Sequence, residues 1–171
     1  MSASRLRALG LPSEEAFRSL FSRYYGAVFG YAARRIGWDN AGDAAAEVFT
    51  VAWKKIRSVP DGSEALPWLY GVARRVVSNH RRSQQRRERL DAKVAGVPES
   101  RVEHDPTDLD AALESLSDDD REVLMLAAWE GLNPQEMGRV LGCSANAASV
   151  RLHRARGRLS KAWGHEYGGG R

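Results

Sequence analysis

Apolar residues recur at helical spacing along most of this 171-residue chain. A first stripe occupies one face of a helix that is predicted to begin after Pro12. Its members are Phe17, Leu20, Phe21, Tyr24, Val28 and Tyr31. The residues from Gly37 to Gly42 interrupt the pattern, a second stripe runs from Ala44 to Ile56, and a third runs from Leu66 to Val77. A loop is predicted at 58–63, which contains a proline and a glycine. No segment alternates as a half-buried strand does, so the pattern predicts an all-α fold.

The second half of the chain returns to this helical character after a polar stretch. Residues 84–106 are polar and charged and carry a glycine and prolines toward their end, which is typical of a linker; a helical start to it is left open. After them, Ser117 and three aspartates mark a helix start, and Gly131 marks its end. We predict two small helical domains joined by a flexible linker. The first domain is 13–83, the linker 84–106, the second domain 107–163, and a disordered tail 164–171.

The most informative local pattern starts at Asn133, which can cap a short helix and form a capping box with Glu136. Gly138 is small enough to let a following helix cross closely, and Gly142 permits a tight turn. Ser144 then caps a second helix. This order is that of a helix-turn-helix, whose second helix enters the major groove of DNA. The alternative is a helical hairpin with a solvated basic face.

Charge is segregated along the chain. The whole chain carries a formal charge of +4. Residues 68–90 hold seven arginines against one acid, a net charge of +6, and residues 139–163 hold six basic residues and no acid. Residues 99–122 between them carry a net charge of −8. Two basic segments favour a polyanionic partner, most simply nucleic acid. The alternative is two solvated helix faces separated by an acidic spacer.

Several function classes are excluded by composition. No apolar run approaches the ~20 residues that cross a bilayer and no secretory signal is present, so we expect no membrane insertion and a cytoplasmic location. The single cysteine, Cys143, allows no intramolecular disulfide and no cysteine-rich zinc site. The four histidines lack ligand spacing, and no nucleophile–base set stands out. We therefore expect no metal, no cofactor and no enzymatic activity.

Three stretches resemble parts of one family. The sequence EGLNPQEMGRVLGCSANAASVRLHRARGRL resembles the promoter-reading C-terminal domain of bacterial RNA polymerase sigma factors of the sigma-70 family, with RLHRAR (Arg151 to Arg156) as its signature. AGDAAAEVFTVAWKKI resembles the polymerase-binding helix of the other conserved sigma domain, and PWLYGVARRVVSNHRR resembles its −10 helix. Two such domains, with no others, are the layout of the extracytoplasmic-function (ECF) group. The resemblance implies an alternative sigma factor whose partners are core RNA polymerase and promoter DNA. An anti-sigma factor is a further partner that this group commonly has.

The resemblance also implies roles for three sets of residues. The −35 element would be read by Ser144, Asn146, Ser149, Arg151, His153, Arg154 and Arg158, with Arg154 on a base and Arg158 on a phosphate. The −10 element would be met by Trp68, Arg74, Arg75, Asn79, Arg81 and Arg82, and the loop at 58–65 would hold a base taken out of the stack. Core polymerase would bind Asp43, Glu47, Phe49 and Trp53. The alternatives are that Phe49 and Trp53 are core residues and that Trp68 is buried.

Two other functions fit part of the pattern. A stand-alone helix-turn-helix regulator suits both basic segments, but it does not account for the polymerase-binding helix. A nucleic-acid enzyme would also be basic, but the sequence offers neither a metal cluster nor a nucleophile with its base. Tight binding of the isolated protein to promoter DNA would indicate the regulator, whereas a sigma factor should need core polymerase.

Overall fold

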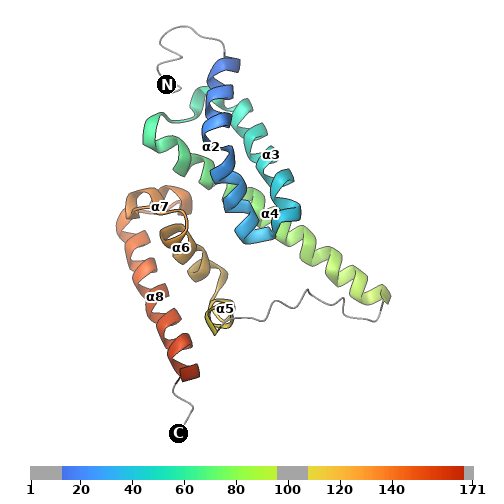
Figure 1. Ribbon diagram of the computed structural model, residues 1–171, viewed down its shortest axis with the longest axis vertical. Helices are drawn as coiled ribbons and strands as arrows, with labels where there is room; N and C mark the ends of the chain where they lie inside the picture. The colour runs from blue at the N-terminus through green and yellow to red at the C-terminus, as the bar shows by residue number, and fades with distance from the viewer. Residues whose placement is uncertain (1–12, 96–107, 168–171) are drawn as a thin grey trace. The chain divides into compact units, whose positions relative to one another are not determined.

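The computed structural model describes residues 13–95 and 108–167 of the chain (Figure 1). Across these residues the regular structure is helical, and no β-strand is present. The chain divides into two compact units, Met1–Ala95 and Gly96–Arg171. The predicted all-α fold with two helical domains is therefore confirmed. No helix in the described ranges combines the length and apolarity needed to span a bilayer.

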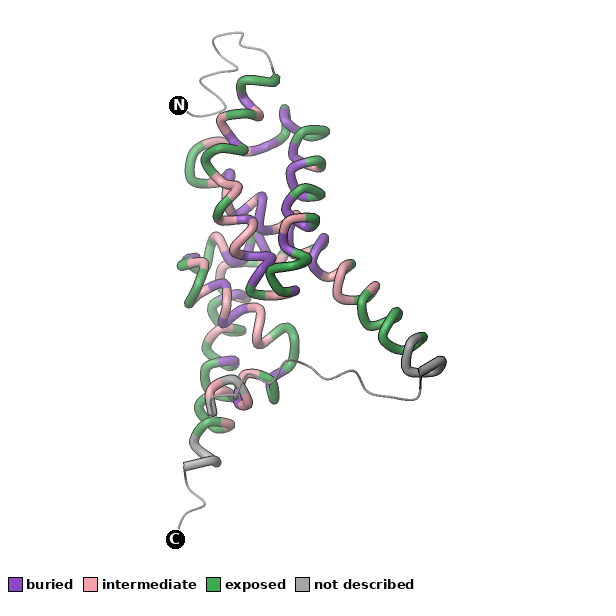
Figure 2. The backbone as a smooth tube through the Cα atoms, turned by 45° about the vertical axis from the view of Figure 1, so that its right-hand side comes forward, coloured by how far each residue is buried: buried purple, intermediate pink, exposed green. Residues whose placement is uncertain are grey.

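Over its described residues, 13–95, the first unit is built from three long helices and two short 3-10 turns. The helices are α2 (Ser13–Ile36), α3 (Trp38–Lys54) and α4 (Ala65–Ala95), and the turns are η1 (Ile56–Ser58) and η2 (Gly62–Glu64). Each of the three helices packs against the other two. The residues buried between them appear in purple in Figure 2 and include Leu20, Val28, Tyr31, Val48, Phe49, Leu69, Val76 and Val77. Three amphipathic helices thus share one core.

The break between α2 and α3 is shorter than the sequence pattern predicts. Gly37 alone lies outside the two helices, with a φ of 80°, a value that glycine adopts readily. The side-chain amide of Asn40 donates to the backbone carbonyl oxygen of Ile36 at 3.1 Å, which satisfies one acceptor left unpaired at the end of α2. Gly42 lies inside α3. The interruption of the apolar pattern from Gly37 to Gly42 therefore corresponds to a single non-helical residue, because one residue suffices to turn the chain.

Helix α4 extends well into the predicted linker. Pro67 lies in its first turn, where the missing N–H costs no helical hydrogen bond. The helix then continues through residues 84–95, so the helical reading of the linker's start is correct and these residues belong to the first unit. Residues 84–95 are rich in arginine, glutamine and alanine, which are strong helix formers, and they contain no glycine; the first glycine of the predicted linker is Gly96. Residues 96–106 of the predicted linker lie outside the described residues.

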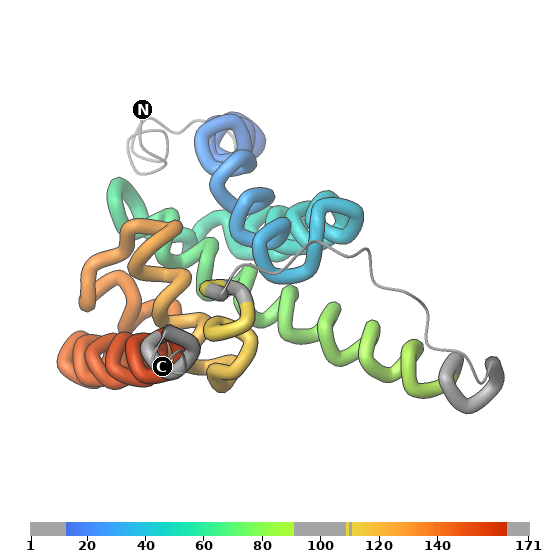
Figure 3. The backbone as a smooth tube through the Cα atoms, turned by 60° about the horizontal axis from the view of Figure 1, so that its bottom comes forward, coloured from blue at the N-terminus to red at the C-terminus, as the bar shows by residue number. Residues whose placement is uncertain are grey.

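Between residues 108 and 167 the second unit has four helices, coloured from yellow to red in Figure 3. They are α5 (Asp108–Glu114), α6 (Asp118–Ala128), α7 (Pro134–Leu141) and α8 (Ala145–Tyr167). Helix α8 contacts the other three, and the core between them includes Val123, Leu126, Met137, Val140, Ala148 and Ala155. Helix α8 runs to Tyr167 and so includes residues 164–167 of the predicted tail, whereas residues 168–171 lie outside the described residues.

Candidate nucleic-acid interface

Local hydrogen bonds define the start of α7. The side-chain oxygen of Asn133 accepts from the backbone N–H groups of Gln135 and Glu136, at 2.9 Å and 3.0 Å. In return, a carboxylate oxygen of Glu136 accepts from the backbone N–H of Asn133 at 2.8 Å. Both halves of the predicted capping box are present. They satisfy backbone donors that the helix itself leaves unpaired.

The turn between α7 and α8 brings two backbones into direct contact. Gly142 has a φ of 69°, and the N–H of Cys143 donates to the carbonyl oxygen of Gly138 at 2.8 Å. A Cβ atom on Gly138 would lie only 2.7 Å from the carbonyl oxygen of Cys143. The hydroxyl of Ser144 accepts from the N–H of Ala147 at 3.1 Å and so caps α8. The predicted close crossing and tight turn are confirmed, and helices α7 and α8 form a helix-turn-helix.

Helix α8 presents a polar face to solvent opposite its buried alanines, Ala148 and Ala155. Besides Arg158, five of the predicted −35 residues on this helix are exposed: Asn146, Ser149, Arg151, His153 and Arg154. At about 100° per residue, all of these except Arg151 fall on one side of the helix, while Arg151 lies on its flank. Val150, which is 40% exposed, lies in the middle of the same face. Sequence reasoning missed Val150, although its position one turn after Asn146 was a usable signal.

Arg158 is engaged within the second unit. Its Nη1 atom lies 2.6 Å and 2.7 Å from the two carboxylate oxygens of Asp120 at the start of α6. The hydroxyl of Ser117 donates to the same carboxylate at 2.9 Å. The side chain of Asp120 is only 13% exposed, so this ion pair is partly shielded from water. A phosphate contact by Arg158 would therefore share the guanidinium group with Asp120.

Helix α4 divides the predicted −10 residues into two groups. Arg75, Asn79 and Arg82 are exposed and lie on one side of the helix with the half-buried Trp68. The guanidinium of Arg82 also donates to the hydroxyl of Ser78 at 3.0 Å. The other two arginines, Arg74 and Arg81, are half-buried and interact with other parts of the protein. The outward group is the one that a nucleic acid can reach without any rearrangement of the helix.

The loop before α4 contains an unsatisfied acceptor. One carboxylate oxygen of Asp61 is buried and has no hydrogen-bond partner in the described part of the chain. The loop is held in place by the hydroxyl of Tyr24, which donates to the carbonyl oxygen of Gly62 at 3.3 Å. A buried acceptor without a donor is costly, and in folded proteins such a group normally finds a partner in the protein, in an ordered water or in a ligand. Sequence reasoning proposed a base pocket in this loop but did not single out Asp61.

The predicted polymerase-binding residues do not all share one face of α3. Asp43 and Glu47 are exposed and Trp53 is 45% exposed, whereas Phe49 is 2% exposed. The ring of Phe49 packs against Phe21 at a centroid distance of 4.9 Å. The prediction of Phe49 as a surface anchor is wrong, because a residue two positions after Glu47 points to the other side of the helix, toward α2. The alternative, a core role, is correct for Phe49.

Glu47 is linked to the neighbouring helix. Its carboxylate lies 2.8 Å from the Nε2 atom of His80 on α4. Sequence reasoning assigned no role to His80, since the two residues are far apart in the chain and only the packing of α3 on α4 brings them together. The pair connects the helix that carries the predicted polymerase residues to the helix that carries the predicted −10 residues.

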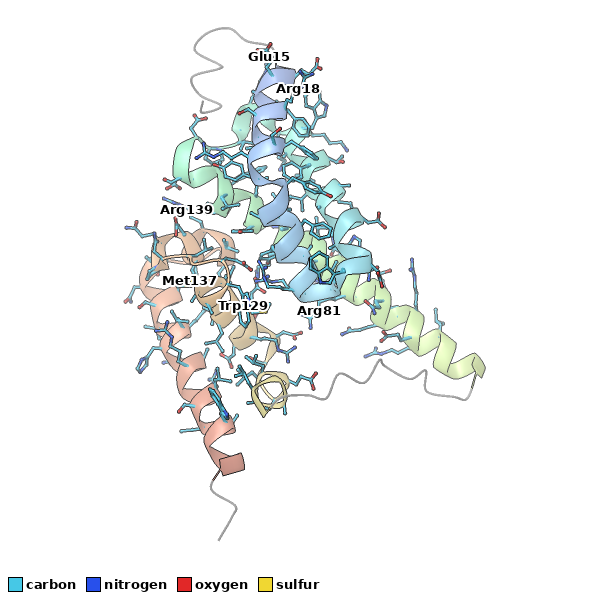
Figure 4. All side chains as sticks on the ribbon, viewed as in Figure 1. Glu15, Arg18, Arg81, Trp129, Met137 and Arg139 are labelled. Atoms are coloured by element: carbon cyan, nitrogen blue, oxygen red, sulfur yellow. The ribbon has the colours of Figure 1, made fainter. Side chains whose placement is uncertain are left out.

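Exposed aromatic residues occur in both units. Trp38, at the start of α3, is 75% exposed, and its ring lies 5.3 Å from that of Phe29. In the second unit Trp129 is 55% exposed at the end of α6, whereas Met137 is fully buried; both residues are labelled in Figure 4. Among the residues that the structure describes, no cluster of histidine, cysteine and carboxylate side chains could hold a metal ion.

Both units match models of known protein families. The model described as sigma-70, region 4 matches residues 107–159, and the model described as sigma-70 region 2 matches residues 20–87. Each match falls within one structural unit. The order of the two regions in the chain is the order expected from the sequence motifs.

Curated relatives and a solved structure agree with these matches. ECF RNA polymerase sigma factor EcfG of Rhodopseudomonas palustris is 28% identical over 127 residues, covering 71% of this chain and 70% of that protein. RNA polymerase sigma factor CarQ of Myxococcus xanthus is 28% identical over 162 residues, covering 89% and 91%. The sigma factor RpoE of Bartonella quintana, solved in complex with the anti-sigma factor NepR, is 26% identical with a TM-score of 0.61, covering 85% of this chain and 95% of that one.

Proposed function

The chain belongs to the sigma-70 family of bacterial RNA polymerase sigma factors, in the extracytoplasmic-function group, and we propose a division of labour between its two units. As a member of this family it binds core RNA polymerase and directs promoter recognition and transcription initiation. In our proposal the first unit holds the polymerase and meets the −10 element, and the second unit reads the −35 element. The protein acts by binding rather than by covalent catalysis, in the cytoplasm where its polymerase works.

The exposed face of α8 is the observation that carries the −35 assignment. Its start is capped and its crossing with α7 is set by a backbone contact, so the side chains on this face are held on a rigid helix. Asn146 and Arg154 carry the groups that pair with adenine and guanine edges in the major groove, and Val150 can pack against a thymine methyl group. Ser149 and His153 add further polar contacts. Arg151 lies on the flank, where it would contact phosphate.

The −10 assignment rests on the outward side of α4 and on the loop before it. Trp68 offers a ring on which an unpaired base can stack, and such stacking is worth ~1–3 kcal/mol per base. Arg75, Asn79 and Arg82 continue along the same side, where they can neutralise or hydrogen-bond the DNA backbone. The unsatisfied oxygen of Asp61 would accept a hydrogen bond from the exocyclic amino group of a base turned out of the stack. We place Arg74 and Arg81 in a supporting role, since they interact within the protein.

The polymerase contact involves the exposed residues Asp43, Glu47 and Trp53 of α3. Asp43 and Glu47 lie one turn apart on one side of α3, and Trp53 lies about 100° round the helix, where it offers an exposed aromatic anchor of the kind found in protein–protein hot spots. Phe49 is buried on the side toward α2 and makes no contact itself. The solved relative from Bartonella quintana is bound to an anti-sigma factor, and we propose that an anti-sigma factor also regulates this protein.

Transcription in vitro with core polymerase across a randomised promoter library tests the proposed function. The full chain should direct initiation only in the presence of core polymerase, and from promoters that share both a −35 and a −10 element. Arg154→Ala should relax the preference at a single −35 position at a cost of ~1–3 kcal/mol, whereas Arg151→Ala should weaken all promoters alike. Tight, specific footprinting by the isolated protein would instead indicate a stand-alone regulator, and this result would overturn the proposal.

A further inference from the structure

Helix α4 continues beyond the core of the first unit. Its C-terminal part extends past the ends of α2 and α3 (Figures 1 and 3), and in Figure 2 its colour changes from buried to exposed along its length. Residues 84–90 are all exposed, so no packing within the unit explains the side chains that they carry. Three of these residues are arginines: Arg86, Arg87 and Arg89.

Two of these arginines extend the proposed −10 face. At about 100° per residue, Arg86 and Arg89 fall on the same side of α4 as Arg75, Asn79 and Arg82. All five residues are exposed. The single acid among residues 68–90, Glu88, lies on the opposite side of the helix, where it pairs with Gln84 at 3.2 Å. The helix therefore carries a basic stripe, defined here as Arg75, Arg82, Arg86 and Arg89, along the side opposite Glu88.

We propose that Arg86 and Arg89 bind backbone phosphates of duplex DNA next to the −10 element, on the side of the −35 element. This inference rests on the proposed −10 role of α4. Trp68, which precedes the stripe on the same side of α4, would face the unpaired bases, so the far end of the helix leads away from them onto duplex DNA. From Arg75 to Arg89 the helix rises ~21 Å, at ~1.5 Å per residue. This length matches ~6 base pairs at ~3.4 Å each.

The chemistry of the stripe favours a nucleic acid backbone over a protein. Arginine guanidinium groups bind phosphate through paired N–H donors, and a row of them at helical spacing follows an anionic strand. Contacts of this kind carry no sequence information, so they would position α4 and add affinity equally on all promoters. In the described part of the chain, Arg86 and Arg89 form no ion pair that DNA would have to displace.

The test measures binding of the full chain with core polymerase to a fluorescent promoter duplex over a series of salt concentrations. Each lost phosphate contact should lower the salt slope by ~0.9, which corresponds to an ~8-fold loss of affinity at 0.1 M salt. The double variant Arg86→Gln/Arg89→Gln should therefore lose ~60-fold in affinity and ~1.8 in slope. Arg87→Gln is the matched control, because it removes the same charge from the same turn but lies off the stripe. It should change affinity less than ~2-fold, and circular dichroism should show all variants to be folded.

Four other results would overturn the proposal. If the double variant kept the wild-type affinity and salt slope, Arg86 and Arg89 would make no phosphate contacts. If Arg87→Gln lost as much DNA affinity as Arg86→Gln, the effect would be one of general charge. Weaker binding to core polymerase without DNA would make the polymerase the partner of the stripe. Tighter DNA binding by the double variant would mean that the stripe opposes DNA binding. A wild-type complex without promoter preference would instead refute the proposed function itself, so the two failures are distinguishable.

Discussion

Replacing Gly138 with alanine perturbs the closest contact in the helix-turn-helix. The new Cβ would lie 2.7 Å from the carbonyl oxygen of Cys143, 3.2 Å from the carbonyl carbon of Ser144 and 3.3 Å from the nitrogen of Ala145. All three are backbone atoms of the turn and of the first residue of α8. They can move away only if α8 shifts relative to α7. The substitution therefore strains the element that orients the DNA-reading face.

Two opposing terms set the size of the effect. Overpacking of a well-packed site costs ~1–3 kcal/mol, and a backbone contact this short belongs in the upper part of that range. Alanine gains ~1 kcal/mol over glycine inside a helix. The expected net loss is ~1–2 kcal/mol in the free energy of unfolding, which lowers the Tm of the second unit by ~5–10 °C.

The same substitution at Gly157 is a matched control. Gly157 lies within α8, and a Cβ built on it meets nothing within 4 Å. Only the propensity term remains, so Gly157→Ala should stabilise the second unit by ~0.5–1 kcal/mol. The two glycine-to-alanine changes should therefore act with opposite signs.

Hydrogen exchange of the α7 and α8 amides measures both effects on the second unit alone, and binding to a −35 duplex measures the consequence for recognition. Gly138→Ala should speed exchange and weaken binding, while Gly157→Ala should slow exchange and leave binding intact. If Gly138→Ala were as stable as wild type, the close crossing would not constrain the motif and the argument from the backbone contact would fail.

Three further predictions concern other contacts. Asn133→Ala should destabilise the second unit by ~1 kcal/mol through loss of the capping box, as urea denaturation would show. Phe49→Ala should lower the free energy of unfolding by ~3–5 kcal/mol, because it leaves a cavity in the core. Trp53→Ala should instead leave the helical circular dichroism intact and weaken co-purification with core polymerase. A folded Phe49→Ala variant that no longer binds the polymerase would contradict the core role of Phe49. A double-mutant cycle of Arg158→Gln and Asp120→Asn should show coupling of ~1 kcal/mol in stability, with no change in the salt slope of DNA binding. A slope lower by ~0.9 in Arg158→Gln would restore its role as a phosphate contact.

Local features were predictable because each depends on residues that are close together in the chain. The capping box joins Asn133 to Glu136, and the turn at Gly142 follows within the same short segment. Ser117 caps α6 through the N–H of Asp120, as the run of aspartates indicates. Even the close approach at Gly138 could be predicted, since a helix-turn-helix requires a small residue there and glycine is the smallest.

The side of a helix that faces the core was less predictable. Phe49 and Trp53 have similar chemistry and lie one turn apart, yet one is buried and the other is nearly half exposed. The difference depends on where α2 lies against α3, because the rings of Phe17, Phe21 and Tyr25 surround Phe49. The hydrophobic pattern of α3 alone is compatible with either arrangement.

Helix propensity and sequence motifs thus determined the all-α fold, the two units and the helix-turn-helix, since these depend on interactions within a few residues. Only the tertiary structure decided the roles of individual charged side chains. Arg158 meets Asp120 across 38 positions of the chain, and His80 meets Glu47 across 33. No local pattern encodes such pairs, because they form only when two helices pack in one particular register and bring the side chains within hydrogen-bonding distance.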